Sequence, residues 1–90
     1  DEAAAMGMIY KRFDDETFEA ETKKIAETLA QMPTLGLGLT KRLLNHTFSN
    51  NLEQQLELEK DLQVEAGSSY DFKEGVAAFL EKRKPVFKGK

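Results

Sequence analysis

The chain has 90 residues, of which 40% are hydrophobic and 32% charged, and it carries a net charge of −3 and no cysteine. This length allows one domain, and the lack of cysteine excludes a disulfide framework, a thiolate nucleophile and a cysteine-type zinc site. No apolar run approaches the roughly 20 residues of a membrane span, and the acidic start DEAAAMGM is not a signal peptide.

The first thirteen residues are unusual for the beginning of a domain. Asp1 to Met6 has the composition of a short helix, and Gly7 is placed to end it as its C′ residue. Residues 8–13 are rich in β-forming side chains without clean alternation, which predicts a short extended segment. A lone strand has nothing here to pair with. We therefore expect residues 1–13 to lie against a part of the protein that these 90 residues lack.

Two amphipathic helices are predicted next, over residues 15–32 and 34–48. Asp14 and Asp15 favour a helix start, and Pro33 separates the two helices. The second helix contains Gly36 and Gly38, each of which costs about 1 kcal/mol relative to alanine. These glycines predict a fraying helix start or the close approach of another backbone. They do not form a phosphate loop, because the later glycine and the Gly-Lys-Ser/Thr ending are absent.

Two further helices are predicted over residues 51–66 and 72–83. Asn50 with Glu53, and Asp71 with Glu74, have the spacing of N-terminal capping pairs. Pro85 disfavours helix at the preceding residue and should end the last helix near residue 83. Apolar faces are predicted on both helices, made of Leu52, Leu56, Leu58, Leu62 and Ala66 on the first and Phe72, Val76, Phe79 and Leu80 on the second. The fold class is therefore all-α, with four amphipathic helices after a short N-terminal helix and an extended segment.

The residues show no catalytic constellation and no metal site. His46 is the only histidine, and without other ligands near it in the pattern it is interpreted as structural. Ser49, Ser68 and Ser69 lie in predicted turns and are interpreted as capping residues. The sixteen carboxylates fall mostly on polar helix faces, whereas a general acid or base needs burial or a close like charge to shift its pKa.

The basic C-terminal end is the one remaining candidate for binding. Residues 71–90 carry six basic and three acidic side chains, so residues 1–70 are strongly acidic, which disfavours nucleic acid as a partner. Phe79 and Lys82 are three residues apart and adjacent on the helix surface. A ring beside an ammonium group could stack a base and pair with a phosphate. The residues alone favour a simpler interpretation, with Phe79 in a core and Lys82 as ordinary surface charge.

The sequence also resembles a known family. The segment EGVAAFLEKRKPVFKG resembles the C-terminal signature of the crotonase superfamily, the enoyl-CoA hydratase/isomerase family. AAAMGMIYKRF resembles the turn by which the chain leaves the catalytic core in that family, and AETLAQMPTLGLGLTKRLLN resembles the helix pair that follows. The resemblance covers essentially the whole chain in order. Within the family the chain is similar to the ring-isomerising or hydratase-like enzymes of phenylacetyl-CoA breakdown.

The resemblance implies a longer protein, whose spiral ββα core supplies the backbone oxyanion hole and the catalytic carboxylates. Residues 14–90 would be the C-terminal helical domain, which in the family helps to build trimers or dimers of trimers and covers the acyl-CoA site. Residues 1–13 would be the remnant of the junction with the missing core. No catalytic residue, metal or cofactor is then expected in this chain. An acyl-CoA would be the substrate of a cytoplasmic parent enzyme, with neither membrane nor nucleic acid as partner.

Two residues acquire a role from the resemblance. Lys82 matches the lysine that in some members reaches the adenosine-phosphate end of CoA bound to a neighbouring subunit. Phe79 matches the aromatic residue one turn earlier. Some hydratases also place an aromatic residue on the preceding helix against the adenine, and Gln63 stands at that position here.

Two alternatives stay open. The chain could be a free-standing helical protein–protein interaction module without catalysis, or a small nucleotide- or RNA-binding module, which the acidic body disfavours. The complete reading frame distinguishes a free-standing module from an enzyme. A start codon just before Asp1 favours the free-standing module. An upstream core of the family type favours an enzyme.

Overall fold

The protein is all-helical, as expected from the sequence. The computed structural model describes all 90 residues and contains five helices, α1 (Glu2–Ala5), α2 (Asp15–Ala30), α3 (Thr34–Asn45), α4 (Leu52–Ser68) and α5 (Tyr70–Glu81). Residues 8–13 form no strand and connect α1 to α2 without regular structure. None of the five helices combines the length and the apolar composition that crossing a bilayer requires.

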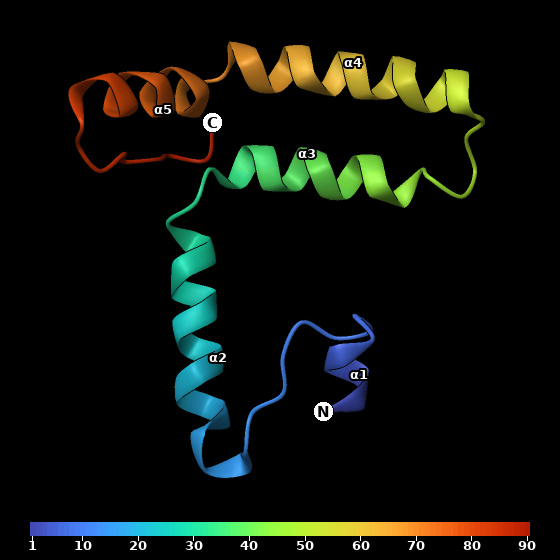
Figure 1. The fold of residues 1–90 in the computed structure, drawn as a ribbon. Helices are drawn as coiled ribbons and strands as arrows, with labels where there is room; N and C mark the ends of the chain where they lie inside the picture. Colours follow the sequence, from blue (N-terminus) through green and yellow to red (C-terminus); the bar gives the residue numbers. More distant parts are fainter.

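The helices form an open arrangement. α3 lies beside α4, and α5 continues from the end of α4 (Figure 1). The last residues, 82–90, which we call the tail, return along α5 toward its start (Figure 1). α2 points away from this layer, with the segment that connects α1 to α2 beside it (Figure 1). The radius of gyration is 16.7 Å, against about 12 Å for a compact domain of this length.

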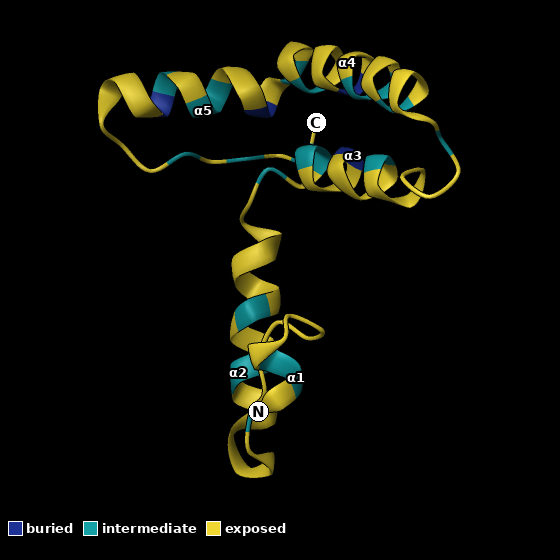
Figure 2. Cartoon of the chain, turned by 45° about the vertical axis from the view of Figure 1, so that its right-hand side comes forward, coloured by how far each residue is buried: buried dark blue, intermediate teal, exposed yellow.

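Very little of the chain is buried. Figure 2 shows exposed residues over most of α2, α3, α4 and α5. Only Leu39 of α3, Leu62 of α4, and Asp71 and Ala78 of α5 are buried. The predicted apolar face of α4 is therefore only partly correct, because Leu62 is buried while Leu52 and Leu56 are exposed. The helices pack edge to edge in one layer, so one α4 face meets α3 and the rest meets solvent.

Both predicted capping pairs are wrong in register. α4 is capped by Asn51, whose side chain accepts a hydrogen bond from the Gln54 backbone N–H at 2.9 Å, while the Gln54 side chain accepts one from the Asn51 N–H. Asn50 instead donates to the Gln55 side chain at 3.1 Å. α5 is capped by Ser69, which accepts a hydrogen bond from the Phe72 N–H at 3.0 Å. The chain around Ser69 is extended, and this places its hydroxyl, rather than the Asp71 carboxylate, at the helix end.

The predicted helix ends shift by two or three residues. α3 stops at Asn45 because the next turn tightens, with the His46 and Thr47 N–H groups donating to carbonyls three residues back. Phe48 is then left in a turn and is fully exposed. α4 runs through Gly67 to Ser68, two residues beyond the predicted end. The predicted stop at Gly7 is confirmed, since its φ of 77° is the left-handed conformation of a C′ residue.

Gly36 and Gly38 do not behave as predicted within this chain. Both lie inside α3, so the helix does not fray there. A Cβ atom built on either glycine would meet nothing within 4 Å, so no backbone of this chain approaches them. The space beside these glycines is open.

Candidate functional site

The two faces of α5 have opposite surroundings. The most buried face carries Asp71, Glu74, Gly75 and Ala78, at helical spacings of three and four. The tail covers this face, and the ring of Phe87 lies 3.6 Å from the position that a Cβ on Gly75 would occupy. A small residue at position 75 thus lets an aromatic ring of the tail rest on the helix.

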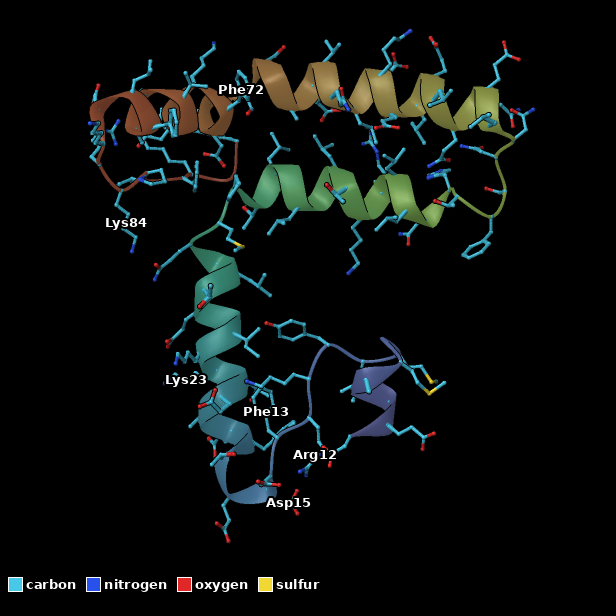
Figure 3. The ribbon with its side chains drawn as sticks, in the orientation of Figure 1. Arg12, Phe13, Asp15, Lys23, Phe72 and Lys84 are labelled. Carbon is cyan, nitrogen blue, oxygen red and sulfur yellow. The ribbon has the colours of Figure 1, made fainter.

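The predicted apolar face of α5 is exposed instead. Phe72, at the start of α5 in Figure 3, lines an open groove together with Val76, Phe79 and Leu80. The groove measures about 450 Å³ and also includes Pro33 before α3, Gly36 and Ala66. A row of large apolar side chains at a groove is an unusual surface for an isolated domain and is typical of a contact site.

Phe79 and Lys82 both lie on the surface, but only Phe79 lines the groove. Phe79 is 82% exposed, so its interpretation as a core residue is wrong for this chain. Lys82 follows the last residue of α5 and adopts a left-handed conformation, with φ of 54° and ψ of 39°. Its backbone N–H donates to the Phe79 carbonyl at 3.3 Å, and its exposed ammonium group makes no ion pair.

The neighbouring Arg83 has two carboxylate partners. Arg83 makes a bidentate ion pair with Glu74, at 2.7 and 3.0 Å, and bonds to Glu81 at 2.6 Å. The Arg83 guanidinium and the Val86 N–H lower the pKa of Glu74 from 4.5 to about 2. The hydrogen bonds from Glu74 and Glu81 raise the pKa of Arg83 further above its already high value. The Lys82 ammonium group, unlike the Arg83 guanidinium, is not paired with a carboxylate.

Two other lysines of the tail lie against neutral groups. The Lys88 ammonium lies 4.6 Å from the centre of the Tyr70 ring. Lys84 extends from the tail toward the end of α2 (Figure 3), where its Nζ is 3.5 Å from the Gln31 side-chain oxygen. Both ammonium groups thus lie against neutral partners rather than carboxylates.

Several other sequence candidates have local partners. His46 Nδ1 lies 2.8 Å from the Arg42 carbonyl. The Ser49 and Ser68 hydroxyls donate to backbone carbonyls three and four residues back. Gln63 is exposed and donates to the Glu59 carboxylate at 3.3 Å. No three histidine, cysteine or acidic side chains gather in a way that could hold a metal ion.

Residues 1–90 thus form an open, all-helical domain with an apolar groove beside a cationic tail. The family model for enoyl-CoA hydratase/isomerase matches residues 1–90. The chain is 48% identical to 1,2-epoxyphenylacetyl-CoA isomerase of Escherichia coli over 90 residues, which are 100% of this chain and 34% of that protein. It is 33% identical to crotonyl-CoA hydratase of Syntrophomonas wolfei over 97% of this chain and 34% of the relative.

Solved structures agree with these relatives. The crystal structure of an enoyl-CoA hydratase from Polaromonas sp. JS666 superposes with a TM-score of 0.89 at 31% identity, covering 97% of this chain and 34% of that one. The chain belongs to the enoyl-CoA hydratase/isomerase family. It spans about a third of the length of the relatives it matches. The resemblance to the crotonase superfamily inferred from the sequence is confirmed.

Proposed function

We propose that residues 1–90 are the C-terminal helical domain of a cytoplasmic enoyl-CoA hydratase/isomerase that acts on acyl-CoA thioesters. The parent enzyme would hydrate an enoyl-CoA, or shift its double bond, through an enolate stabilised by an oxyanion hole outside these residues. One observation carries the proposal: a chain that buries only four of its residues matches the family over its whole length. Such a chain needs further protein against its apolar surface.

The exposed apolar side chains mark where that further protein would pack. They form the groove along α5 and a second group around α2 and the segment before it, which includes Tyr10, Leu29 and Met32. Residues 1–13 would be the junction with the catalytic core, and residues 14–90 the domain that covers the acyl-CoA and contributes to a trimer. Apolar groups of this size, left in water, would favour association.

Lys82 and Phe79 would contribute to the CoA site of a neighbouring subunit. An exposed ammonium group without a carboxylate partner can form charge-assisted hydrogen bonds to a phosphate. An exposed aromatic ring one turn earlier can cover part of an adenine. The similarity to an isomerase of 1,2-epoxyphenylacetyl-CoA supports a substrate carrying an aromatic or ring-derived acyl group.

The test is to express the complete reading frame that contains residues 1–90 and to assay it beside the 90-residue chain. The complete protein should hydrate crotonyl-CoA or isomerise 1,2-epoxyphenylacetyl-CoA and should sediment as a trimer or a dimer of trimers. The 90-residue chain should show neither activity. Enzyme-like turnover by the 90 residues alone would contradict the proposal, because it would place the catalytic groups inside this chain.

A free-standing interaction module is the second candidate, favoured by the same exposed apolar groove. In that case the reading frame would begin just before Asp1, and the chain would bind a partner helix without any turnover of CoA thioesters. The complete reading frame therefore decides between the two candidates before any assay is run.

A further inference from the structure

The tail is folded back on α5 by two carboxylates of that helix. Asp71 is 2% exposed and accepts hydrogen bonds from the backbone N–H groups of Lys88 at 2.7 Å and Gly89 at 2.9 Å. The Asp71 N–H in turn donates to the Lys90 carbonyl at 3.0 Å. The far end of the tail is therefore fixed beside the first turn of α5.

Glu74 holds the near end of the tail. Its two carboxylate oxygens accept hydrogen bonds from the Arg83 guanidinium at 2.7 and 3.0 Å. One of these oxygens also accepts a hydrogen bond from the Val86 backbone N–H at 2.9 Å. Glu74 thus binds the tail at two residues, Arg83 immediately after Lys82 and Val86 three residues further on.

Lys82 itself is the only residue other than glycine with a positive φ. In this region Cβ crowds the following carbonyl oxygen, so glycine is the usual occupant at this point of a helix end. The turn closes with a hydrogen bond from the Arg83 N–H to the Ala78 carbonyl at 3.0 Å. A non-glycine residue keeps such a conformation when its surroundings impose it, and such residues cluster at binding sites.

We propose that Glu74 is a positioning residue for Lys82, holding the turn after α5 so that the ammonium group is set in place for a phosphate monoester. The inference rests on the proposed contact between Lys82 and CoA, and it adds the group that makes this contact effective. A lysine on a fixed backbone loses less conformational freedom on binding than one on a mobile tail. Glu74 therefore acts through Arg83 and Val86 and does not touch the ligand.

The experiment compares CoA with 3′-dephospho-CoA, which lacks only the 3′-phosphate, by calorimetry on the complete protein that contains residues 1–90. The unaltered protein should bind CoA about tenfold more tightly than 3′-dephospho-CoA, the ratio of one charge-assisted hydrogen bond. Lys82→Ala should remove this preference. Glu74→Ala should reduce it to about twofold, and Lys82→Ala with Glu74→Ala should equal Lys82→Ala alone, as expected for groups that act as a unit.

Two conservative variants keep the test valid if an alanine variant does not fold. Glu74→Gln keeps an acceptor for the Val86 N–H but loses the ion pair, and Arg83→Lys loses the bidentate geometry. Each should give an intermediate preference for CoA with an unchanged affinity for 3′-dephospho-CoA. If Glu74 and Arg83 had a purely structural role, the affinity for CoA and the affinity for 3′-dephospho-CoA would fall equally. Glu65→Gln is the matched control, since it breaks an exposed pair with Arg42, 3.5 Å long, between α3 and α4.

The outcomes separate the inference from the function on which it rests. If Lys82→Ala removes the preference but every variant of Glu74 and Arg83 retains it, the positioning role is wrong and the Lys82 contact stands. If Lys82→Ala itself retains the preference, the contact fails and the positioning role fails with it.

Discussion

The two ends of this chain are attached to its helices in different ways. The tail is held along α5 by carboxylates that are buried or nearly so, since the Asp71 residue is 2% exposed and the Glu74 side chain 11%. The N-terminal segment is held by Arg12, which pairs with Asp1 at 2.7 Å and Asp14 at 2.8 Å. These distances are as short as those in the tail, but the Arg12 side chain is half exposed.

The difference shows that distance alone does not determine how firmly a segment is held. Exposed ion pairs contribute little, because water and salt screen them and two long side chains must be ordered. A buried carboxylate that accepts backbone N–H groups is worth more, because breaking its bonds leaves unpaired groups away from water. Beside α2, Phe13 (Figure 3) and Tyr10 add some apolar contact, but Phe13 is only half-buried and Tyr10 is exposed. The tail is therefore part of the fold, while the ion pairs of the N-terminal segment, residues 1–14, are exposed.

The largest effect is expected from Asp71→Ala. This change leaves the Lys88 and Gly89 N–H groups without their acceptor and should cost about 3 kcal/mol. The tail would detach from α5, so amide exchange of Lys88 and Gly89 should approach the rate of an unfolded chain. Urea unfolding followed by circular dichroism, with exchange measured by NMR, checks both expectations.

Asp61→Ala is the control for this prediction, because Asp61 is exposed on the same layer of helices. It should change the free energy of unfolding by less than about 0.5 kcal/mol. Equal effects of the two changes would contradict the prediction, because the Asp71 hydrogen bonds would then contribute no more than an exposed carboxylate.

The sequence predicts the helices well and the tail poorly, for a physical reason. Helix existence follows from local periodicity, and the stop at Gly7 from local backbone preference, so both are found. The spacing of Asp71 and Glu74 fits a capping box equally well, and only the reversal of the chain at Lys82 redirects both carboxylates to the tail. That reversal needs a left-handed lysine, which no sequence rule predicts.

The exposed groove could not be predicted from the sequence either. A pattern such as Phe72, Val76, Phe79 and Leu80 predicts an apolar face but does not say what covers it. The spacing from Phe79 singled out the candidate lysine and the family resemblance gave it a role, whereas the contacts of Glu74 with the tail required the structure.

Gly89→Ala should have the second-largest effect, about 2 kcal/mol, because an L residue is strained at positive φ. Gly89 has a φ of 72°, and an added Cβ would lie 2.6 Å from the Thr34 hydroxyl oxygen. Adding Thr34→Ala to Gly89→Ala removes that hydroxyl, so it should relieve the clash but not the backbone strain. Thermal unfolding of the three proteins separates these two contributions.

Gly67→Ala is the matched control for the glycine change. Gly67 lies in α4, and a Cβ there would meet nothing within 4 Å. This change should be neutral or stabilising by up to about 1 kcal/mol. If Gly67→Ala destabilised the protein as much as Gly89→Ala, the effect at Gly89 could not be assigned to its positive φ and its closeness to Thr34.

A smaller effect is expected from acid. The folded-state pKa of Glu74 is lowered to about 2 by Arg83 first and the Val86 N–H second, with Lys88 adding to the effect. A lowered pKa stabilises the folded state above the usual value of 4.5, and this contribution disappears as the pH falls from 4.5 toward 2. Protection of the Val86 amide against exchange should fall over that range. In Glu74→Gln, protection of the Val86 amide should be lower at neutral pH than in the unaltered protein. It should not fall between pH 4.5 and 2 because of residue 74, since glutamine does not titrate.

The smallest effect is expected from Arg12→Ala, which tests the other end of the chain. Both of its ion pairs are exposed, so their loss should change the free energy of unfolding by at most about 0.5 kcal/mol. Salt should reduce even this difference, because exposed charges are screened. Arg83→Ala is the paired comparison, since its carboxylate partner Glu74 is only 11% exposed, and it should be the more damaging change. Urea unfolding at low and high salt measures both, and an Arg12→Ala effect as large as that of Arg83→Ala would mean that the N-terminal segment is held by the chain itself.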